Sequence, residues 1–239
     1  MTASLIDVAK GSVIGHRTVT IVGRRTDLST SEHDVWTGGE SGGTTTRAVP
    51  SSAGAMSIVS SSADDAAAGT GARSVEIDYL DGDYLEQTKV VALAGATPVV
   101  TTELGLRVQR VRVKEAGSGE VNAGAISVSI GGSLQAHIPA GLGESPQALW
   151  TVPAGYQALL LREWIESSSA ATGRLYRRAS GATSARQMRR EHRTTSPHGG
   201  SNARALEAFT QKTDIMFRAI SDGGAAHVVA GVELLLVAL

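Results

Sequence analysis

The sequence predicts an all-β protein: an antiparallel, jelly-roll-like β-sandwich with an extended N-terminal arm. Short runs rich in β-branched residues alternate with Gly, Ser, Thr and Ala from about residue 19 to residue 239. Roughly ten to twelve such runs follow one another about ten residues apart, a spacing that is typical of sandwiches and jelly rolls. Only residues 203–212 carry a helix signal, so helices contribute little to the predicted fold.

The composition is sufficient for a core but excludes several kinds of site. The 239 residues are 41% hydrophobic and 4% aromatic, so the core must consist mainly of Val, Ile, Leu and Ala. The lack of cysteine excludes disulfides and thiolate metal sites. A net charge of −1 provides no overall field that would recruit nucleic acid or a membrane. No apolar run is long enough to span a bilayer.

The predicted organisation divides the chain near residue 55. The region 1–55 consists of an arm at 1–15, a first strand at 16–23 and a Gly/Ser/Thr-rich segment at 26–55, and the β-sandwich domain is 56–239 with an Arg-rich insertion at about 173–204. The segment at 26–55 is too long for a passive loop, so either it is mobile or it lies against another surface with Trp36 as its anchor. We expect region 1–55 to serve assembly more than the core.

The clearest predicted element is a hairpin over 73–93. Apolar and acidic residues alternate along its first strand, and its second strand is expected at 84–93. Asp81-Gly82 between them is a favoured type I′ pair, in which both central residues have positive φ. We therefore expect a two-residue turn there, and we expect Gly82→Val to destabilise it because a β-branched residue resists positive φ.

The later strands are predicted from their turns and from apolar periodicity. In 105–113 the apolar positions change parity, which predicts a β-bulge near Gln109-Arg110. Gly131-Gly132 predicts a hairpin turn, and Pro153 ends a strand before a turn at 150–155. Strands are expected at 125–130, 133–138, 156–164 (a central strand), 174–178 and 187–190 (both exposed), 214–220 and 227–238.

Candidate metal ligands in the sequence have simpler explanations. Asp78, Asp81 and Asp83 surround the predicted turn, but they lack the spacing of a calcium-binding loop. His192 and His198 lack the helical spacing of a zinc motif. We therefore expect no metal and no other cofactor.

No catalytic residue is expected either. The segment 39–43, Gly-Glu-Ser-Gly-Gly, matches the Gly-x-Ser-x-Gly pattern of a nucleophile elbow. That elbow needs a strand before the serine and a helix after it, and this copy lies in a Gly/Ser/Thr-rich segment with neither. The match is explained by the biased composition.

The strongest local charge feature is the Arg-rich stretch, in which Glu191 is the only acid between Arg174 and Arg193. Such a positive patch favours contact with an acidic face of a partner protein, because the guanidinium fork suits carboxylates. A solvated hairpin whose charges prevent edge aggregation is the next interpretation. Nucleic acid comes last, since Tyr176 is the only aromatic residue there. The candidate partner-binding residues are Trp36, Arg174, Arg177, Arg178, Arg186, Arg189, Arg190 and Arg193.

Exposed charges contribute little to stability, so replacing Arg186, Arg189 and Arg190 together should leave the fold intact.

Aromatic residues that could stack on sugars are few. Trp150 and Trp164 lie in or beside apolar runs and are expected in the core.

Residues 57–165 resemble a family of tailed-phage structural proteins. The segments that carry the resemblance are Ser74-Val-Glu-Ile-Asp78, Tyr79-Leu-Asp-Gly-Asp-Tyr84, Glu86-Gln-Thr-Lys-Val-Val-Ala-Leu-Ala-Gly-Ala-Thr-Pro-Val99, Leu106-Arg-Val-Gln-Arg-Val-Arg-Val113, Ala116-Gly-Ser-Gly119, Asn122-Ala-Gly-Ala-Ile126, Ile138-Pro-Ala-Gly141 and Trp150-Thr-Val-Pro-Ala-Gly155. These segments are turns and strand edges, so they point to a fold family more than to a chemistry. The segments 26–55 and 174–193 depart from the family pattern.

The resemblance implies a β-sandwich protein of the virion, made in the host cytoplasm and assembled in multiple copies. Its expected position is the head–tail neck (collar) or the tail, with neck, portal, tail or capsid proteins and further copies of itself as partners. The alternatives are a capsid decoration protein and a tail-associated module that binds a receptor or carbohydrate. A membrane partner is not expected.

Overall fold

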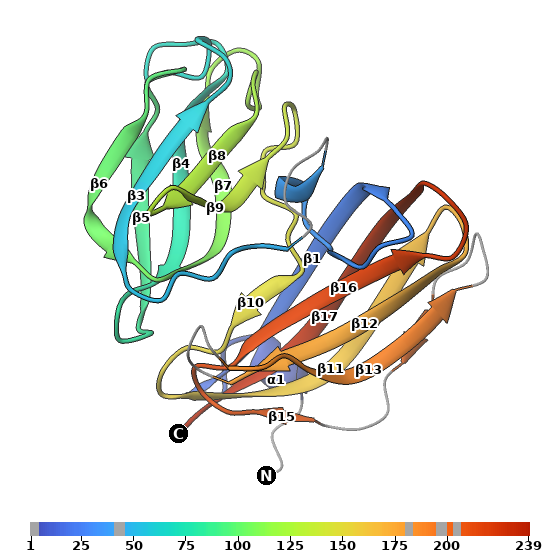
Figure 1. The fold of residues 1–239 in the computed structure, drawn as a ribbon. Coiled ribbons are helices and arrows are strands. Elements are labelled where there is room, and N and C mark those ends of the chain that lie inside the picture. The colour runs from blue at the N-terminus through green and yellow to red at the C-terminus, as the bar shows by residue number, and fades with distance from the viewer. Residues whose placement is uncertain (1–4, 41–45, 180–183, 195–199, 203–206) are drawn as a thin grey trace. The chain divides into compact units, whose positions relative to one another are not determined.

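The computed structural model describes residues 5–40, 46–179, 184–194, 200–202 and 207–239. Figure 1 shows that the regular secondary structure of these residues is nearly all β-strand, and every strand pair among them is antiparallel, which confirms the predicted all-β fold class. One short α-helix, α1 (Leu5–Ala9), precedes the first strand. The stretch 203–212, the one candidate for a helix, contains a short strand at Ala208–Phe209, and its residues 203–206 lie outside the described residues.

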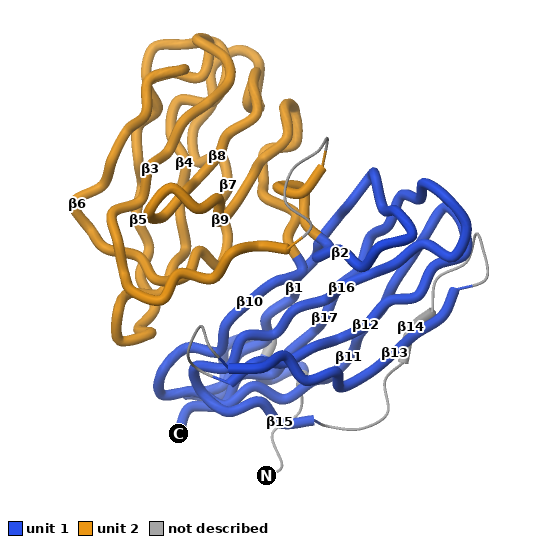
Figure 2. Tube along the Cα trace, in the orientation of Figure 1, with its two compact units in different colours: residues 1–35, 148–239 blue, residues 36–147 orange. Residues whose placement is uncertain are grey.

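The chain forms two compact units, and the second is an insertion in the sequence of the first (Figure 2). Unit 1 comprises residues 1–35 and 148–239, and unit 2 comprises residues 36–147. The structure therefore does not divide at the predicted position near residue 55. The reason is that β1 pairs with β17, so the first and last strands of the chain lie side by side in one sheet.

Unit 1 is a sandwich of two sheets. The strands of the first sheet, in order, are β1 (His16–Leu28), β17 (Ala226–Ala238), β11 (Tyr156–Ser167) and β14 (Gly200–Asn202), with β15 (Ala208–Phe209) also on β11. The second sheet has the order β10 (Leu149–Thr151), β16 (Asp214–Ser221), β12 (Ala171–Arg178) and β13 (Gln187–Thr194), with β2 (His33–Asp34) also on β16. Side chains of both sheets, such as Leu234 and Phe217, pack into one buried core.

Unit 2 is a smaller sandwich with its own core. One sheet has the order β6 (Val99–Gly105), β3 (Gly54–Ser60), β8 (Ile126–Ile130) and β9 (Ser133–Ile138), and the other has the order β5 (Glu86–Ala92), β4 (Ala72–Leu80) and β7 (Arg107–Ala116). Ile58 and Ile77 are two of the fully buried residues between these sheets. The 3₁₀ turn η1 (Thr37–Gly39) precedes the first strand of this unit.

Several predicted turns and strands are confirmed. Asp78 pairs with Arg110 and Tyr79 with Val108, so Gln109 is the extra residue of the predicted bulge in β7. The amide of Gln147 donates to the carbonyls of Val108 and Gln109, both at 3.1 Å, which stabilises the bulge. Gly131 and Gly132 have φ values of 56° and 78°, as a type I′ turn between β8 and β9 requires. Strand β11 is central in its sheet, as predicted.

The hairpin of β4 and β5 is confirmed, but the predicted two-residue turn is wrong. The turn spans 81–85, and its positive φ of 67° is at Tyr84 rather than at Gly82. The carboxylate of Asp81 accepts the backbone N–H groups of Asp83 and Leu85, each at 3.0 Å, and so fixes the longer turn. A Cβ on Gly82 would have ordinary van der Waals contact with Ala53, so the stated reason for the Gly82→Val effect does not hold.

Three expectations, one about region 1–55 and two about the Arg-rich stretch, also need correction. Region 1–55 is not mainly outside the core, because β1 places the buried residues Ile21 and Leu28 in the core of unit 1. The Arg-rich stretch is not an insertion, because β12 lies inside the second sheet between β16 and β13. Of β12 and β13, only β13 is at an edge of that sheet, so the prediction of two exposed strands is wrong for β12.

Candidate functional site

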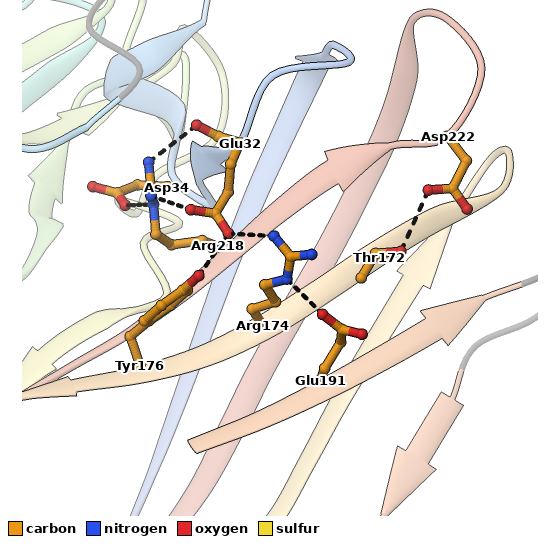
Figure 3. A network of polar contacts seen from close by, with 8 residues as sticks. All are labelled: Glu32, Asp34, Thr172, Arg174, Tyr176, Glu191, Arg218 and Asp222. Atoms are coloured by element: carbon orange, nitrogen blue, oxygen red, sulfur yellow. Dashed lines mark hydrogen bonds and ion pairs between the residues drawn. The ribbon is translucent and has the colours of Figure 1, made fainter. Parts of the chain in front are cut away.

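The Arg-rich strands β12 and β13 pair with each other and meet acidic side chains from distant parts of the chain. Figure 3 shows Arg174 between two carboxylates, with its Nε 2.7 Å from Glu191 and its Nη1 3.1 Å from Glu32. These hydrogen bonds, first that to Glu191 and then that to Glu32, hold the pKa of Arg174 above its usual value. Arg174 therefore stays cationic and paired.

Glu32 is the centre of this network. It accepts a 2.8 Å hydrogen bond from the hydroxyl of Tyr176 and also binds Arg218 of β16. Arg218 in turn donates from Nε to Asp34 at 2.9 Å (Figure 3). Asp34 is buried. Burial, followed by the hydrogen bond to Glu32, raises the pKa of the Tyr176 phenol. The network fixes the short strand β2 on the second sheet.

Other arginines of the stretch also have partners within the chain. Arg178 is 2.8 Å from Asp214, Arg193 is 3.0 Å from Asp222, and Arg177 donates to Gln187 at 3.0 Å. Arg189 and Arg190 both face Glu207, and Arg186 is exposed just before β13. The expected patch of unopposed positive charge is therefore wrong. The assignment of these arginines to a partner contact stays a prediction.

A buried carboxylate lies beneath the Arg-rich edge. Glu163 of β11 is completely buried, and its Oε1 is 2.8 Å from Nε2 of His192 and 3.4 Å from Nε of Arg190. It points inward because Leu161 forms a bulge, with Leu160 paired to Leu234 and Arg162 paired to Glu233. The bulge reverses the facing of every later residue in β11. The sequence did not predict the contacts of Glu163 with His192 and Arg190, because the apolar run at 159–161 gives no sign that the facing of the side chains changes there.

The position of Arg190 beside buried Glu163 predicts that Arg190 contributes more to stability than Arg186 does. Arg190→Ser should lower the free energy of unfolding by about 2 kcal/mol, because a buried carboxylate loses a cationic neighbour. Arg186→Ser is the matched control and should change it by less than about 0.5 kcal/mol, because Arg186 is exposed. Urea unfolding curves of both variants measure the difference, and equal midpoints would contradict it. The expectation that Arg190 contributes little to the fold is thus revised.

A serine–histidine contact occurs at the start of β2. The hydroxyl of Ser29 is 2.7 Å from Nε2 of His33. Burial and then the charge of Arg25 lower the pKa of His33. Its Nδ1 is buried and has no hydrogen-bond partner among the described residues, so no carboxylate orients the ring as in a Ser-His-Asp triad. The contact closes the turn between β1 and β2.

The aspartates of the predicted turn are occupied by structural contacts. Asp78 accepts from Thr88 at 2.9 Å and pairs with Arg112 at 3.1 Å, while Asp81 fixes the turn. Across the described part of the chain, no group of His, Asp or Glu side chains is arranged to hold a metal ion. His198 and most of the Gly-x-Ser-x-Gly match lie outside the described residues. None of the described helices has the length and apolar character needed to cross a bilayer.

The three tryptophans lie in different surroundings. Trp36 is completely buried, which is at odds with its assignment to a partner-binding surface. Trp150 is buried in the core of unit 1, as expected. Trp164 is only half-buried and points away from that core, because the bulge at Leu161 places it on the outer face of the first sheet. The expectation for Trp164 is therefore wrong.

Comparisons with known proteins give weak likenesses. No family model and no curated protein matches the chain. Two structures of infectious bursal disease virus are among its weak structural neighbours. That of the Gx strain has 13% identity and a TM-score of 0.23, covering 93% of this chain and 76% of that chain. That of the Gt strain has 11% identity and a TM-score of 0.25, covering 94% and 71%.

A third neighbour is the VP2 subviral particle of the same virus. It has 10% identity and a TM-score of 0.19, covering 99% of this chain and 78% of that chain. TM-scores this low show no shared overall arrangement, so we infer nothing about function from these likenesses.

Proposed function

We propose that this chain is a non-enzymatic structural component of a tailed-phage virion, assembled in multiple copies at the head–tail neck (collar) or in the tail. The observation that carries the proposal is the resemblance of residues 57–165 to virion proteins of tailed phages. These residues run from β3 to β11. The resemblance therefore follows nearly all strands of unit 2 and enters the central strand of unit 1.

The use of the polar side chains supports a structural role. Carboxylates such as Glu32, Glu163 and Asp65 are held by hydrogen bonds or ion pairs within the fold. Within the described ranges, no residue supplies the Ser29–His33 contact with the third member of a catalytic triad. Function would then lie in the faces and edges of the two sandwiches. Many copies in a symmetric assembly make individually weak contacts collectively strong.

Labelling of virions tests this proposal. A tagged copy, produced in the host during infection, should be found in purified particles by mass spectrometry. Negative-stain images with a gold-labelled antibody to the tag should place the label at the neck or along the tail. A label spread over the capsid would support a decoration protein instead and would contradict the neck or tail position. Absence of the chain from purified particles would overturn the structural role altogether.

A further inference from the structure

On the outer face of the first sheet of unit 1, a row with one acid and one base lies between two largely apolar rows. Because β-strand side chains alternate, the residues that point away from the core lie in rows across β1, β17 and β11. Three neighbouring rows are Val22–Gly231–Trp164, then Thr20–Glu233–Arg162, then Thr18–Leu235–Leu159. An apolar row thus lies on each side of a row with one acid and one base.

These three rows carry more apolar side chains than the next row of the same face, Arg24–Val229–Glu166. Val22 is 43% exposed, and Trp164, Leu159 and Leu235 are half-buried. Gly231 leaves room for the indole, since a Cβ there would lie 2.3 Å from Cζ2 of Trp164. The outer face of the second sheet instead carries the polar network around Glu32 (Figure 3). Apolar surface with few charges is the composition of the central part of a protein interface.

The charges on this face are complementary to those on the same face of a second copy. Arg162 and Glu233 are direct partners on neighbouring strands, and the guanidinium of Arg162 also lies 5.5 Å from the centre of the Trp164 ring. A two-fold axis parallel to the strands, between β17 and β11, exchanges the two strand positions in a facing copy. Arg162 then lies opposite Glu233 of the second copy, and Leu159 lies opposite Leu235 of the second copy. Trp164 likewise lies opposite Gly231 of the second copy, and because each indole covers the Gly231 of its own chain, the two indoles would pack against each other across the axis.

We propose that this face of unit 1, formed by β1, β17 and β11, is the contact between two copies of the chain. The proposal rests on the proposed function, for which it names the surface that joins copies. The contact would be isologous, with the same ion pair formed twice and apolar rows packed on both sides. The alternative is that this face binds a carbohydrate whose sugar ring stacks on Trp164, and the experiment must distinguish this from contact with a second copy.

Charge reversal in two separate variants tests the proposal. Arg162→Glu alone and Glu233→Arg alone each place like charges opposite each other twice in the dimer, so each should weaken association at least about tenfold. An equimolar mixture of the two variants should recover the dimer, because opposite charges then face each other at both positions. Sedimentation velocity over a range of protein concentrations measures the association, and circular dichroism checks the fold.

The recovery is the decisive result, because each chain in the mixture still carries two like charges at the register partners 162 and 233, and only the pairing between copies has changed. The control is the exposed ion pair Arg110–Glu144 of unit 2, where Arg110→Glu and Glu144→Arg should leave association unchanged. If a reversal at Arg162 or Glu233 unfolds the chain, Val22→Lys replaces it. Val22 is already 43% exposed, so its lysine variant should fold and should associate less tightly.

Three results would overturn the proposal: a wild-type chain that stays monomeric, single variants that associate like the wild type, or a mixture that does not recover. A glycan array on which the wild type binds and Trp164→Ala does not, together with a monomeric wild type, would assign the face to carbohydrate instead. The virion labelling is independent of these outcomes. A chain that is present in particles but monomeric in solution overturns this contact and leaves the structural role intact.

Discussion

Replacing Asp65 by alanine is expected to cost unit 2 most of its stability. The carboxylate is completely buried and accepts hydrogen bonds from the backbone N–H groups of Ala72 (2.7 Å), Ala123 (2.8 Å) and Gly124 (2.9 Å) and from the hydroxyl of Ser60 (2.5 Å). It thus joins the loop between β3 and β4 to the segment before β8, which is far away in the sequence. Each buried donor left unpaired costs about 1–3 kcal/mol, so Asp65→Ala should lower the free energy of unfolding by about 4 kcal/mol or more.

Hydrogen exchange measured by mass spectrometry can assign this loss to a unit. Amides in β4 and β8 should exchange faster in Asp65→Ala, while amides in β11 and β17 keep the protection of the wild type. Asp65→Asn retains one acceptor oxygen and should be affected less. A variant with wild-type protection throughout unit 2 would contradict the role given to Asp65.

The same carboxylate gives unit 2 a dependence on acid. Burial raises the pKa of Asp65, but the hydrogen bonds from Ser60 and from the amides of Ala123, Gly124 and Ala72 outweigh it, so the pKa lies below its ordinary value. A lowered carboxyl pKa in the folded state stabilises the fold fully above the unfolded pKa, near pH 4. This stabilisation is lost as the pH falls further, through the folded pKa. The acid-induced loss of stability below about pH 4 should therefore be smaller in Asp65→Asn than in the wild type.

Adding a single methyl group at Gly23 is expected to have a comparable effect on unit 1. A Cβ at Gly23 would lie 2.2 Å from the carbonyl oxygen of Val35 and 2.3 Å from the backbone nitrogen of Ala148. Those two backbone groups are hydrogen-bonded to each other at 2.9 Å, so neither can move away without breaking the pair. Gly23→Ala should therefore destabilise unit 1 by about 3 kcal/mol.

Gly223→Ala is the matched control for this substitution. Gly223 also belongs to unit 1, its φ lies outside the left-handed region, and a Cβ there would have no atom within 4 Å. Its thermal unfolding midpoint should stay at that of the wild type, whereas the midpoint of Gly23→Ala falls by several degrees. Equal midpoints for the two variants would show that the backbone around Gly23 yields easily.

The sequence was sufficient where the determinants of structure are local. The alternation at 73–80 gives β4, the parity change places the bulge at Gln109, and Gly131-Gly132 gives a type I′ turn. Each of these follows from neighbouring residues alone. The turn at 81–85 shows the limit, because the side-chain contacts of Asp81 and the ring of Tyr84, which is 5.6 Å from the guanidinium of Arg107, favour a longer turn.

Non-local pairing accounts for most of what could not be predicted. Nothing in residues 16–28 indicates that their partner is the last strand of the chain, and the acids that neutralise the Arg-rich strands come from positions as distant as Glu32 and Asp222. The inward position of Glu163 and the outward position of Trp164 both depend on the bulge at Leu161. In an apolar run such as 159–161, any of the side chains could point toward the core. Only the register with the paired strand shows which ones do.

The interruption of unit 1 by unit 2 determines the order in which the two can fold during synthesis. All strands of unit 2 have been made once residue 147 is added, and when they have left the ribosome the two ends of the unit are held together by the bridge between Trp36 and Gln147. The core of unit 1 has to wait, because β1 has its neighbour only when β17 is made. Until then β1 is an unpaired strand with apolar residues. When unit 2 folds first, it keeps Val35 close to Ala148. The two parts of unit 1 are then separated by a shorter effective loop, so the entropy cost of pairing β1 with β17 is smaller.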